Sequence, residues 1–422
     1  MTRDSMLDAV VVGGGQAGLG IAYFLKRAGL RFVVYERGRV GESWRSQRWD
    51  SFALNTPNWM NGLPGAPYAG SAPDEFWHRD DLVDSFERYV GRFELPVETG
   101  VSVARVAPQD GGGFEVTSTR GGQRQQLLAR NVVIASGIMQ APLIPAVGAQ
   151  LPDSITQVHT GDYRNPGALP DGAVLVVGSG QSGCQIVEDL LAAGRKVYLC
   201  TSRVGRAPRR HRGRDILAWW QDMGLLDVTL GELEDPAMAK ATQPQISGVG
   251  RYGHTVSLES LAHKGVTLLG HVDRVQGQVL HLDGKLGEYV RFADEKSAAF
   301  HRAIDDYIAR EGIDAPPMED DAADEPDDAL AEARGETELD LAAAGISTVV
   351  WCTGFTADFS WVDAPLSADT GHPVHERGVS PLPGLYYLGF PWLHKRKSGI
   401  IHGVEEDAAY IAQRIHGRAA SD

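Results

Sequence analysis

Short apolar runs that end in glycines divide this chain into segments. Ala9–Val12 is one such run and Ala173–Val177 is another, and neither alternates with polar residues. Runs of this kind are typical of strands that are buried on both faces of a sheet. Small and apolar residues then recur at helical spacing, over Leu19–Leu25 after the first run. The pattern predicts two strand–turn–helix units, which are the building blocks of α/β folds.

Other stretches of the chain carry the same periodicities. Helical spacing predicts helices over 80–93, 293–312 and 403–417, and alternation predicts strands between 101 and 133. Three further apolar runs predict buried strands: VVIASG at 132–137, STVVWCTGF at 347–355 and GLYYLGF at 384–390. The segment Pro316–Asp328 is acidic and contains prolines, which predicts an exposed linker.

The turn after the first apolar run has the spacing G-x-G-x-x-G. Gly13, Gly15 and Gly18 take its three glycine positions. In a dinucleotide-binding unit these glycines make a tight turn, let backbone approach a pyrophosphate, and let the helix pack closely on the strand. The helix N-terminus then offers free N–H groups to the phosphates. Glu36 ends the next apolar run, where an acidic residue binds a ribose hydroxyl. Together these features predict dinucleotide binding rather than a glycine turn without function.

The second unit repeats the turn with Gly178, Gly180 and Gly183. Its next strand ends in Ser202 and Arg203 instead of an acid. An acid would repel a 2′-phosphate, whereas an arginine can pair with it bidentately. Three further arginines follow closely: Arg206, Arg209 and Arg210. We therefore expect this unit to bind NADPH, and the alternative is a solvated basic loop without a ligand.

The composition narrows the class of protein. The chain has 422 residues, 43% of them hydrophobic and 23% charged, which is ordinary for a soluble globular protein of two or three domains. A net charge of −15 argues against a nucleic-acid surface or an anionic membrane patch. No apolar stretch approaches the length of a membrane helix, and the N-terminal residues enter the first strand too quickly for a signal peptide. Cys184, Cys200 and Cys352 form no C-x-x-C pair, so we expect a cytoplasmic protein without disulfides.

The order of these motifs resembles that of the class B flavoprotein monooxygenases, which include flavin-containing monooxygenases and Baeyer–Villiger enzymes. The resemblance covers nearly the whole chain: both glycine turns, VVIASG with its following prolines, WCTGF, and GLYYLGF with its following helix. HTGDYRNP, at 159–166, resembles the second half of the family signature, and His159, Tyr163, Arg164 and Pro166 match it. The first half of that signature is not matched. Tyr163 stands where Baeyer–Villiger enzymes usually have Trp, which favours oxygenation of a heteroatom.

The resemblance implies an α/β fold with two dinucleotide-binding (Rossmann-like) domains. Residues 1–160 and 340–422 are expected to form an FAD-binding domain. Residues 161–339 are expected to form an NADPH-binding domain that is inserted into it. The cofactors implied are FAD and NADPH, and no metal site is expected.

The turns and the resemblance together name candidate site residues. Those expected to bind FAD and NADPH are Gly13, Gly15, Gln16, Ala17, Gly18, Glu36, Arg37, Trp44, Ala135, Gly137, Gly178, Gly180, Gln181, Ser182, Gly183, Ser202, Arg203, Thr353, Gly354 and Gly389. Asn55 and Asn58 lie in the range where related enzymes hold an asparagine near the oxygen intermediate, so they are candidate catalytic residues. His159 is a third candidate, which either positions the nicotinamide cofactor, couples domain movement or is a structural histidine.

The reaction that the resemblance implies is an NADPH-dependent monooxygenation. NADPH reduces FAD, the reduced flavin forms a C4a-hydroperoxide with O₂, and one oxygen atom passes to a small organic substrate at an amine nitrogen or a sulfide sulfur. Three alternatives remain: an oxidoreductase or oxidase without substrate oxygenation, a Baeyer–Villiger reaction, and a non-enzymatic NADPH sensor. The expected partners are the substrate and O₂, without nucleic acid or membrane, and a homodimer is the expectation for a soluble oligomer.

Overall fold

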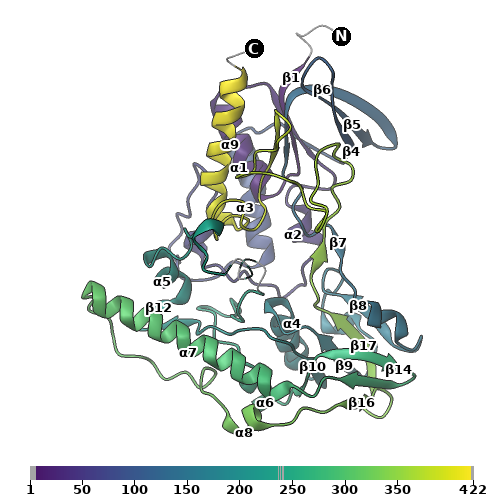
Figure 1. The fold of residues 1–422 in the computed structure, drawn as a ribbon, viewed down its shortest axis with the longest axis vertical. Coiled ribbons are helices and arrows are strands. Elements are labelled where there is room, and N and C mark those ends of the chain that lie inside the picture. Colours follow the sequence, from purple (N-terminus) through teal and green to yellow (C-terminus); the bar gives the residue numbers. More distant parts are fainter. Residues whose placement is uncertain (1–5, 236, 238, 240–241, 420–422) are drawn as a thin grey trace.

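Two sheets, one above the other in Figure 1, organise the computed structural model. The structure describes residues 6–235, 237, 239 and 242–419. In the upper sheet the strand order is β3-β2-β1-β6-β5-β4, and β19 also pairs with β6. These strands are β1 Leu7–Val12, β2 Phe32–Glu36, β3 Val97–Thr99, β4 Val101–Pro108, β5 Phe114–Arg120, β6 Gln123–Ile134 and β19 Leu385–Tyr387. Since β19 pairs in parallel with β6, the C-terminal part of the chain completes the sheet that the N-terminal part begins.

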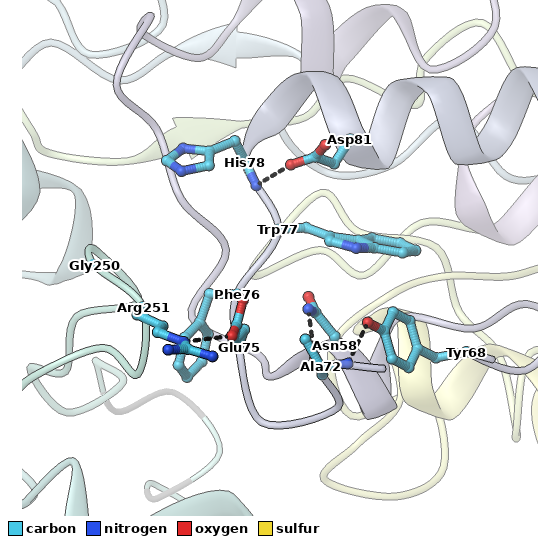
Figure 2. Close-up of a pocket in the computed structure, with 10 residues that line it drawn as sticks. All are labelled: Asn58, Tyr68, Ala72, Glu75, Phe76, Trp77, His78, Asp81, Gly250 and Arg251. Atoms are coloured by element: carbon cyan, nitrogen blue, oxygen red, sulfur yellow. Dashed lines mark hydrogen bonds and ion pairs between the residues drawn. The ribbon is translucent and has the colours of Figure 1, made fainter. Parts of the chain in front are cut away.

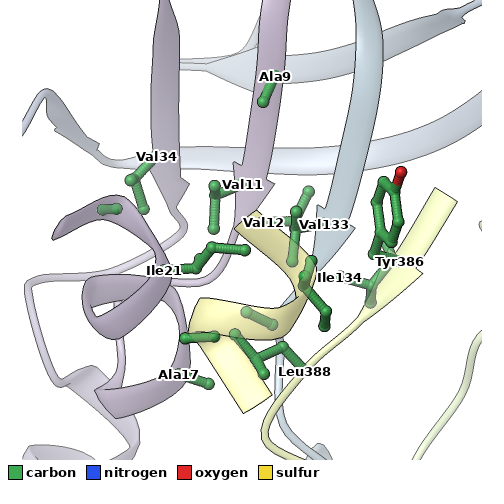
Figure 3. Packing of buried hydrophobic residues seen from close by; sticks show 14 of the residues in the cluster. Ala9, Val11, Val12, Ala17, Ile21, Val34, Val133, Ile134, Tyr386 and Leu388 are labelled. Carbon is green, nitrogen blue, oxygen red and sulfur yellow. The ribbon is translucent and has the colours of Figure 1, made fainter. Parts of the chain in front are cut away.

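Helices pack against the part of the upper sheet around β1 and β2, whose apolar residues are buried along nearly the whole of both strands. They are α1 Gln16–Arg27, α3 Arg79–Arg92 and α9 Val404–Ala419. Residues of β1, β6, β19 and α1 form one buried cluster, part of which Figure 3 shows around Val11 and Ile21. Gly20 lets α9 approach α1, since a Cβ at this position would lie 2.3 Å from Val404 Cγ1. Close packing of this kind is what makes each buried aliphatic side chain worth about 1.5–3 kcal/mol.

The lower sheet is parallel, with the strand order β13-β10-β9-β17-β8. Its strands are β8 Thr156–His159, β9 Ala173–Val177, β10 Val197–Cys200, β13 Thr267–Leu269 and β17 Ile346–Trp351. Its helices are α4 Gln181–Ala192, α6 Leu258–His263 and α7 Leu286–Glu311. A small antiparallel sheet lies beside it, formed by β14 Val272–Gln276, β15 Val279–Leu282 and β16 Glu338–Asp340. The α/β class with two nucleotide-binding units, predicted from the sequence, is confirmed.

The residues that form each sheet do not follow the domain boundaries expected at 160/161 and 339/340. Strands β8 and β17 both pair within the lower sheet, although they lie outside 161–339. Between the two sheets, the chain passes through β7 (Ala141–Pro142) and returns through β18 (Phe355–Thr356), and these two strands pair with each other. An apolar run shows that a strand is buried, but only its pairing partner decides the sheet to which it belongs.

The remaining elements lie between and around the sheets. They are α2 Glu42–Ser46, α5 Ile216–Asp222, α8 Asp328–Glu332, β11 Arg210–His211, β12 Arg214–Asp215 and the 3₁₀ turns Asn58–Met60, Ala146–Gln150, Pro166–Ala168, Leu230–Glu232 and Ile401–Gly403. The segment Pro316–Asp328 is largely exposed, as expected of a linker, but it is anchored at Asp324, which binds the side chains of Arg206, Ser297 and His301. Among the described residues, no helix is both long enough and apolar enough to cross a bilayer.

Candidate functional site

The three glycines of the first turn have two different roles, one in the fold and one in leaving space for a ligand. Gly13 has φ +116°, and a Cβ there would lie 2.4 Å from the carbonyl oxygen of Ala135. A Cβ on Gly18 would lie 1.8 Å from the carbonyl oxygen of Gly13. A Cβ on Gly15, by contrast, would meet nothing within 4 Å. Gly13 and Gly18 are therefore required by the fold, whereas Gly15 faces open space at the N-terminus of α1, where a pyrophosphate fits.

Glu36 is held firmly at the end of β2, beside this turn. Its Oε2 accepts a hydrogen bond from the backbone N–H of Gly14 (2.7 Å), and its Oε1 accepts one from that of Gly38 (2.8 Å). The carboxylate is buried, while its neighbour Arg37 is exposed. Each carboxylate oxygen keeps a second lone pair, so the fixed group can still accept bonds from ribose hydroxyls.

The other residues expected near this turn come from three elements. Trp44, on α2, donates its Nε1–H to Oε1 of Gln16, the first residue of α1 (3.1 Å). The backbone N–H of Ala135, after β6, bonds the carbonyl oxygen of Val12 (2.8 Å), and Gly137 follows two residues later. Gly389, after β19, packs so closely that a Cβ there would lie 2.6 Å from that of Ala17. The ends of β1, β6 and β19 therefore meet at the start of α1.

Arg48 is a cation at this site that the sequence reasoning missed. Its guanidinium lies over the rings of Trp44 and Phe52, at 4.9 and 5.5 Å from their centroids, and touches Met139 Sδ at 3.3 Å. No carboxylate pairs with it in the part of the chain that the structure describes. Burial lowers the pKa of Arg48 to about 10. An unpaired, half-buried cation of this kind is suited to an anionic group of a ligand, and no motif in the sequence marks it.

The second turn repeats the geometry of the first. Gly178 has φ +106°, and a Cβ there would lie 2.5 Å from the carbonyl oxygen of Cys352. A Cβ on Gly183 would lie 1.9 Å from the carbonyl oxygen of Gly178. The nearest atom to a Cβ on Gly180 is Thr242 Cγ2, at 3.7 Å, so this position is open. Gln181 and Ser182 begin α4 directly after it, at a second helix N-terminus that can receive phosphates.

The arginines after β10 differ in their surroundings. Arg203 is exposed, follows the half-buried Ser202, and lies over the ring of Phe292 at 4.4 Å. Arg206 is only 1% exposed and pairs with Asp294 (2.7 Å) and with Asp324. Arg209 is equally buried: its Nε donates to Asp215 Oδ2 at 2.8 Å. Arg210 donates to the carbonyl oxygen of Gly213. The expectation that these arginines extend a phosphate site or form a solvated loop is therefore wrong for Arg206 and Arg209, which are structural.

Asn55 lies where the upper part of the chain meets the second turn. Its Nδ2 donates to Gln181 Oε1 (2.9 Å), and its Oδ1 accepts from Gln185 Nε2 (2.9 Å) and the N–H of Gly248 (3.0 Å). Its carbonyl oxygen accepts from Arg209 Nη1 at 3.0 Å. The Asn55 side chain is thus held by three hydrogen bonds and keeps one N–H donor for another group. The buried Arg209 fixes the backbone beneath it.

Asn58 lies elsewhere, in the wall of a cavity of about 490 Å³. Figure 2 shows it beside Tyr68 and below Trp77, while Glu75 and Arg251 form an ion pair of 2.6 Å at another side. Asn58 is 3% exposed, and its Nδ2 donates to the carbonyl oxygen of Ala72 (2.9 Å). Its Oδ1 is buried and has no hydrogen-bond partner among the described residues. Asn55 and Asn58 therefore do not form one constellation.

His159 is buried at the end of β8, with both ring nitrogens engaged. Its Nδ1 accepts from the backbone N–H of Gly161 (3.1 Å), so Nε2 carries the proton and donates to the carbonyl oxygen of Gly354 (2.8 Å). Burial is the main cause that lowers the pKa of His159. Thr353 bonds the carbonyl oxygen of Leu143 (2.5 Å) on the same connection between the sheets. His159 thus joins β8 to the segment after β17 as a neutral ring.

The basic run near the C-terminus is not available for a ligand. Lys395 and Lys397 both pair with Asp227 and Glu406. Arg396 lies over the ring of Trp220, at 4.7 Å from its centroid. These contacts bind the segment after β19 to the loop after α5 and to α9.

The comparisons agree with this architecture. The family model described as "Pyridine nucleotide-disulphide oxidoreductase" matches residues 10–222. An uncharacterized CzcO-like oxidoreductase of Geobacillus kaustophilus is 31% identical, over 97% of this chain and 98% of that protein. Indole-3-pyruvate monooxygenase YUCCA1 of Oryza sativa subsp. japonica is 26% identical, over 97% of this chain and 91% of its own.

Two solved structures show the same fold. A flavin-containing monooxygenase from Stenotrophomonas maltophilia superposes with a TM-score of 0.66 at 20% identity, covering 98% of this chain and 99% of that one. OTEMO in complex with FAD and NADP superposes with a TM-score of 0.57 at 16% identity, covering 98% of this chain and 86% of that one. The open positions at Gly15 and Gly180 give this chain room for the same two cofactors.

Proposed function

We infer the function from one premise: the chain belongs to the pyridine nucleotide-disulphide oxidoreductase family, as a flavin-dependent enzyme of the monooxygenase type that uses FAD and NADPH. We propose that it adds one oxygen atom of O₂ to a small organic substrate, at an amine nitrogen or a sulfide sulfur. The observation that carries this proposal is the place of Asn55, whose amide bridges the loop of the first nucleotide unit to the first residue of α4. A residue there can contact both cofactors at once.

The cysteines argue against the disulfide chemistry that the family name suggests. Cys184 and Cys200 are buried, and Cys352 is half-buried, and all three are unpaired. Burial raises the pKa of each thiol, which keeps it protonated and unreactive. A flavin in this chain therefore lacks a protein dithiol to reduce, which favours O₂ as the electron acceptor.

The roles of the chain's own residues follow from their contacts. FAD, when bound, supplies the hydride acceptor and the site of O₂ activation. Glu36 holds its adenosine ribose, and the N-terminus of α1 holds its pyrophosphate. Asn55, fixed from below by Arg209, orients the groups that meet between the two turns. His159 keeps the connection between the sheets in place and moves no proton, because both ring nitrogens already bond backbone.

The cavity beside Asn58 is the candidate substrate site. Aromatic rings of Tyr68, Phe76 and Trp77 line it together with polar and charged side chains, so it suits a ligand that has both an apolar body and a polar group. The Asn58 Oδ1 needs a donor, since leaving such an acceptor buried and unpaired costs about 1–3 kcal/mol. An amine with an N–H group supplies that donor, whereas a sulfide does not. Amines are therefore the preferred class.

The test is to follow NADPH consumption, hydrogen peroxide and oxygenated product together, in the FAD-loaded enzyme. A panel of a secondary amine, a sulfide and a cyclic ketone separates the classes. Amine product in step with NADPH supports the proposal. Peroxide equal to NADPH with every compound would establish an oxidase instead, and an ester from the ketone would establish a Baeyer–Villiger enzyme. Asn58→Leu should raise KM for the amine and leave that for the sulfide unchanged.

A further inference from the structure

Two side chains of α7 lie against the segment that follows β10. Phe292 contacts the guanidinium of Arg203, whose Cζ is 4.4 Å from the ring centroid. Lys296, one turn further along α7, has its Nζ 5.5 Å from the same centroid. Its Cβ and Cγ lie 3.3 and 3.2 Å from the place that a Cβ on Gly205 would take. Arg203 and Lys296 therefore both lie near one aromatic ring, close to the segment that follows β10.

Both cations are free of carboxylates. In the described part of the chain no ion pair involves Arg203 or Lys296, whereas Arg206, three residues further on, is paired twice. Asp294, on the same helix, is turned to Arg206 and leaves the two cations unneutralised. Two unpaired cations at one spot form a site for a group with two negative charges.

We propose that Lys296 and Phe292 complete the subsite for the adenosine 2′-phosphate of NADPH, of which Arg203 is the first member. A phosphate monoester carries a charge of about −1.5 to −2 near pH 7. The planar guanidinium of Arg203 binds two of its oxygens, and the ammonium group of Lys296 binds the third as a point charge. The ring of Phe292 covers one side of the guanidinium, which orders Arg203 before the ligand arrives and so reduces the entropy lost on binding.

The place of the subsite in the fold supports this assignment. In a dinucleotide-binding unit the residues after the second strand meet the 2′ position of the ribose. Here that strand is β10, and Ser202 and Arg203 follow it. The inference concerns cofactor selection, so it does not depend on which atom the enzyme oxygenates.

The test is calorimetric binding of two nucleotides to the FAD-loaded protein. 2′,5′-ADP and 5′-AMP differ only in the 2′-phosphate, so the ratio of their affinities isolates the subsite. The loss of one charge-assisted hydrogen bond lowers an affinity about tenfold or more. Lys296→Met should therefore weaken 2′,5′-ADP binding about tenfold or more and leave 5′-AMP binding unchanged. Lys296→Arg should restore most of the loss, and Phe292→Leu should produce a smaller loss than Lys296→Met.

Lys196→Met is the matched control. Lys196 is an exposed lysine that also lies over an aromatic ring, at 5.0 Å from that of Tyr198, but it precedes β10 and so lies at the opposite end of the strand. Its removal should change neither affinity. The proposal is overturned if Lys296→Met binds 2′,5′-ADP as tightly as the unmodified protein, or if it loses both nucleotides equally while keeping its FAD.

Discussion

The side-chain amide of Asn55 donates a hydrogen bond to Gln181 Oε1 across 2.9 Å, and thereby links the two nucleotide-binding units at the first residue of α4. The same side chain accepts bonds from Gln185 and Gly248, and Arg209 holds its backbone. A small residue is thus fixed by four partners at the place where both cofactors are expected. This explains why a buried arginine lies so near the second turn without serving a phosphate.

Asn55→Ala should uncouple NADPH use from oxygenation. The variant loses the amide at the junction that we propose positions the reacting groups, so electrons from NADPH should reach O₂ and leave as hydrogen peroxide. We expect the amount of product formed per NADPH to fall about tenfold, which corresponds to the loss of about one hydrogen bond. NADPH oxidation itself should continue. Asn165→Ala is the control, because Asn165 caps a turn at Ala168 and binds Asp50. Unchanged coupling in Asn55→Ala would show that Asn55 only joins the units.

Gly15 and Gly18 should respond differently to substitution by valine. A side chain at Gly15 enters open space, so Gly15→Val should fold with nearly unchanged stability but purify without FAD. A side chain at Gly18 collides with the carbonyl oxygen of Gly13, so Gly18→Val should lower stability by about 1–3 kcal/mol or more. Thermal unfolding and the flavin-to-protein absorbance ratio separate the two effects. A Gly15→Val protein replete with FAD would contradict the assigned pyrophosphate site.

Arg206→Met and Arg203→Met should likewise separate structure from binding. Removing Arg206 leaves Asp294 and Asp324 without their cation in a buried place, which costs about 3–5 kcal/mol. The melting temperature of Arg206→Met should therefore fall, while the ratio of its affinities for 2′,5′-ADP and 5′-AMP should stay the same as in the unmodified protein. Arg203 is exposed, so Arg203→Met should keep the melting temperature and lower that ratio. The reverse result would mean that the roles of the two arginines are exchanged.

The free energy of unfolding should fall as pH rises, because of the buried carboxyl group of Glu259. Burial, and then the neighbouring Asp294 carboxyl, raise the pKa of Glu259. The folded state therefore holds this proton where the unfolded state has released it. Stability is full below the ordinary glutamate pKa of about 4.3 and declines as pH rises through the folded value, by about 1.4 kcal/mol for each unit of the shift.

Glu259→Gln tests this dependence, since the amide copies the protonated acid. Urea unfolding from pH 5 to 8 should show a flatter profile for the variant, which should be more stable than the unmodified protein at pH 8. The exposed Glu319→Gln serves as control and should leave the profile unchanged. An unaltered slope in Glu259→Gln would assign the pH dependence to another group.

The local units were predictable because each is contiguous in the sequence. Gly13 and Gly18 must be glycines for reasons that lie within one strand, one turn and one helix. Glu36 follows in the next strand, and the spacing alone places it beside that turn. The same holds for Gly178 and its copy of the motif. The assignment of strands β8 and β17 was not predictable, because pairing depends on residues far away in the chain.

The sequence by itself determined that two nucleotide-binding units exist and which glycines shape them, since backbone sterics act over a few neighbouring residues. Only the tertiary structure decided which charges are free. Arg203, Arg206 and Arg209 look alike along the chain, yet Asp294 and Asp324 from distant segments neutralise Arg206 and the nearby Asp215 neutralises Arg209. Among the described residues no carboxylate pairs with Arg203, which lies against Phe292. Lys296 joins Arg203 through a helix that begins more than eighty residues later. Charge pairing is decided by distance in space, and the fold alone sets that distance.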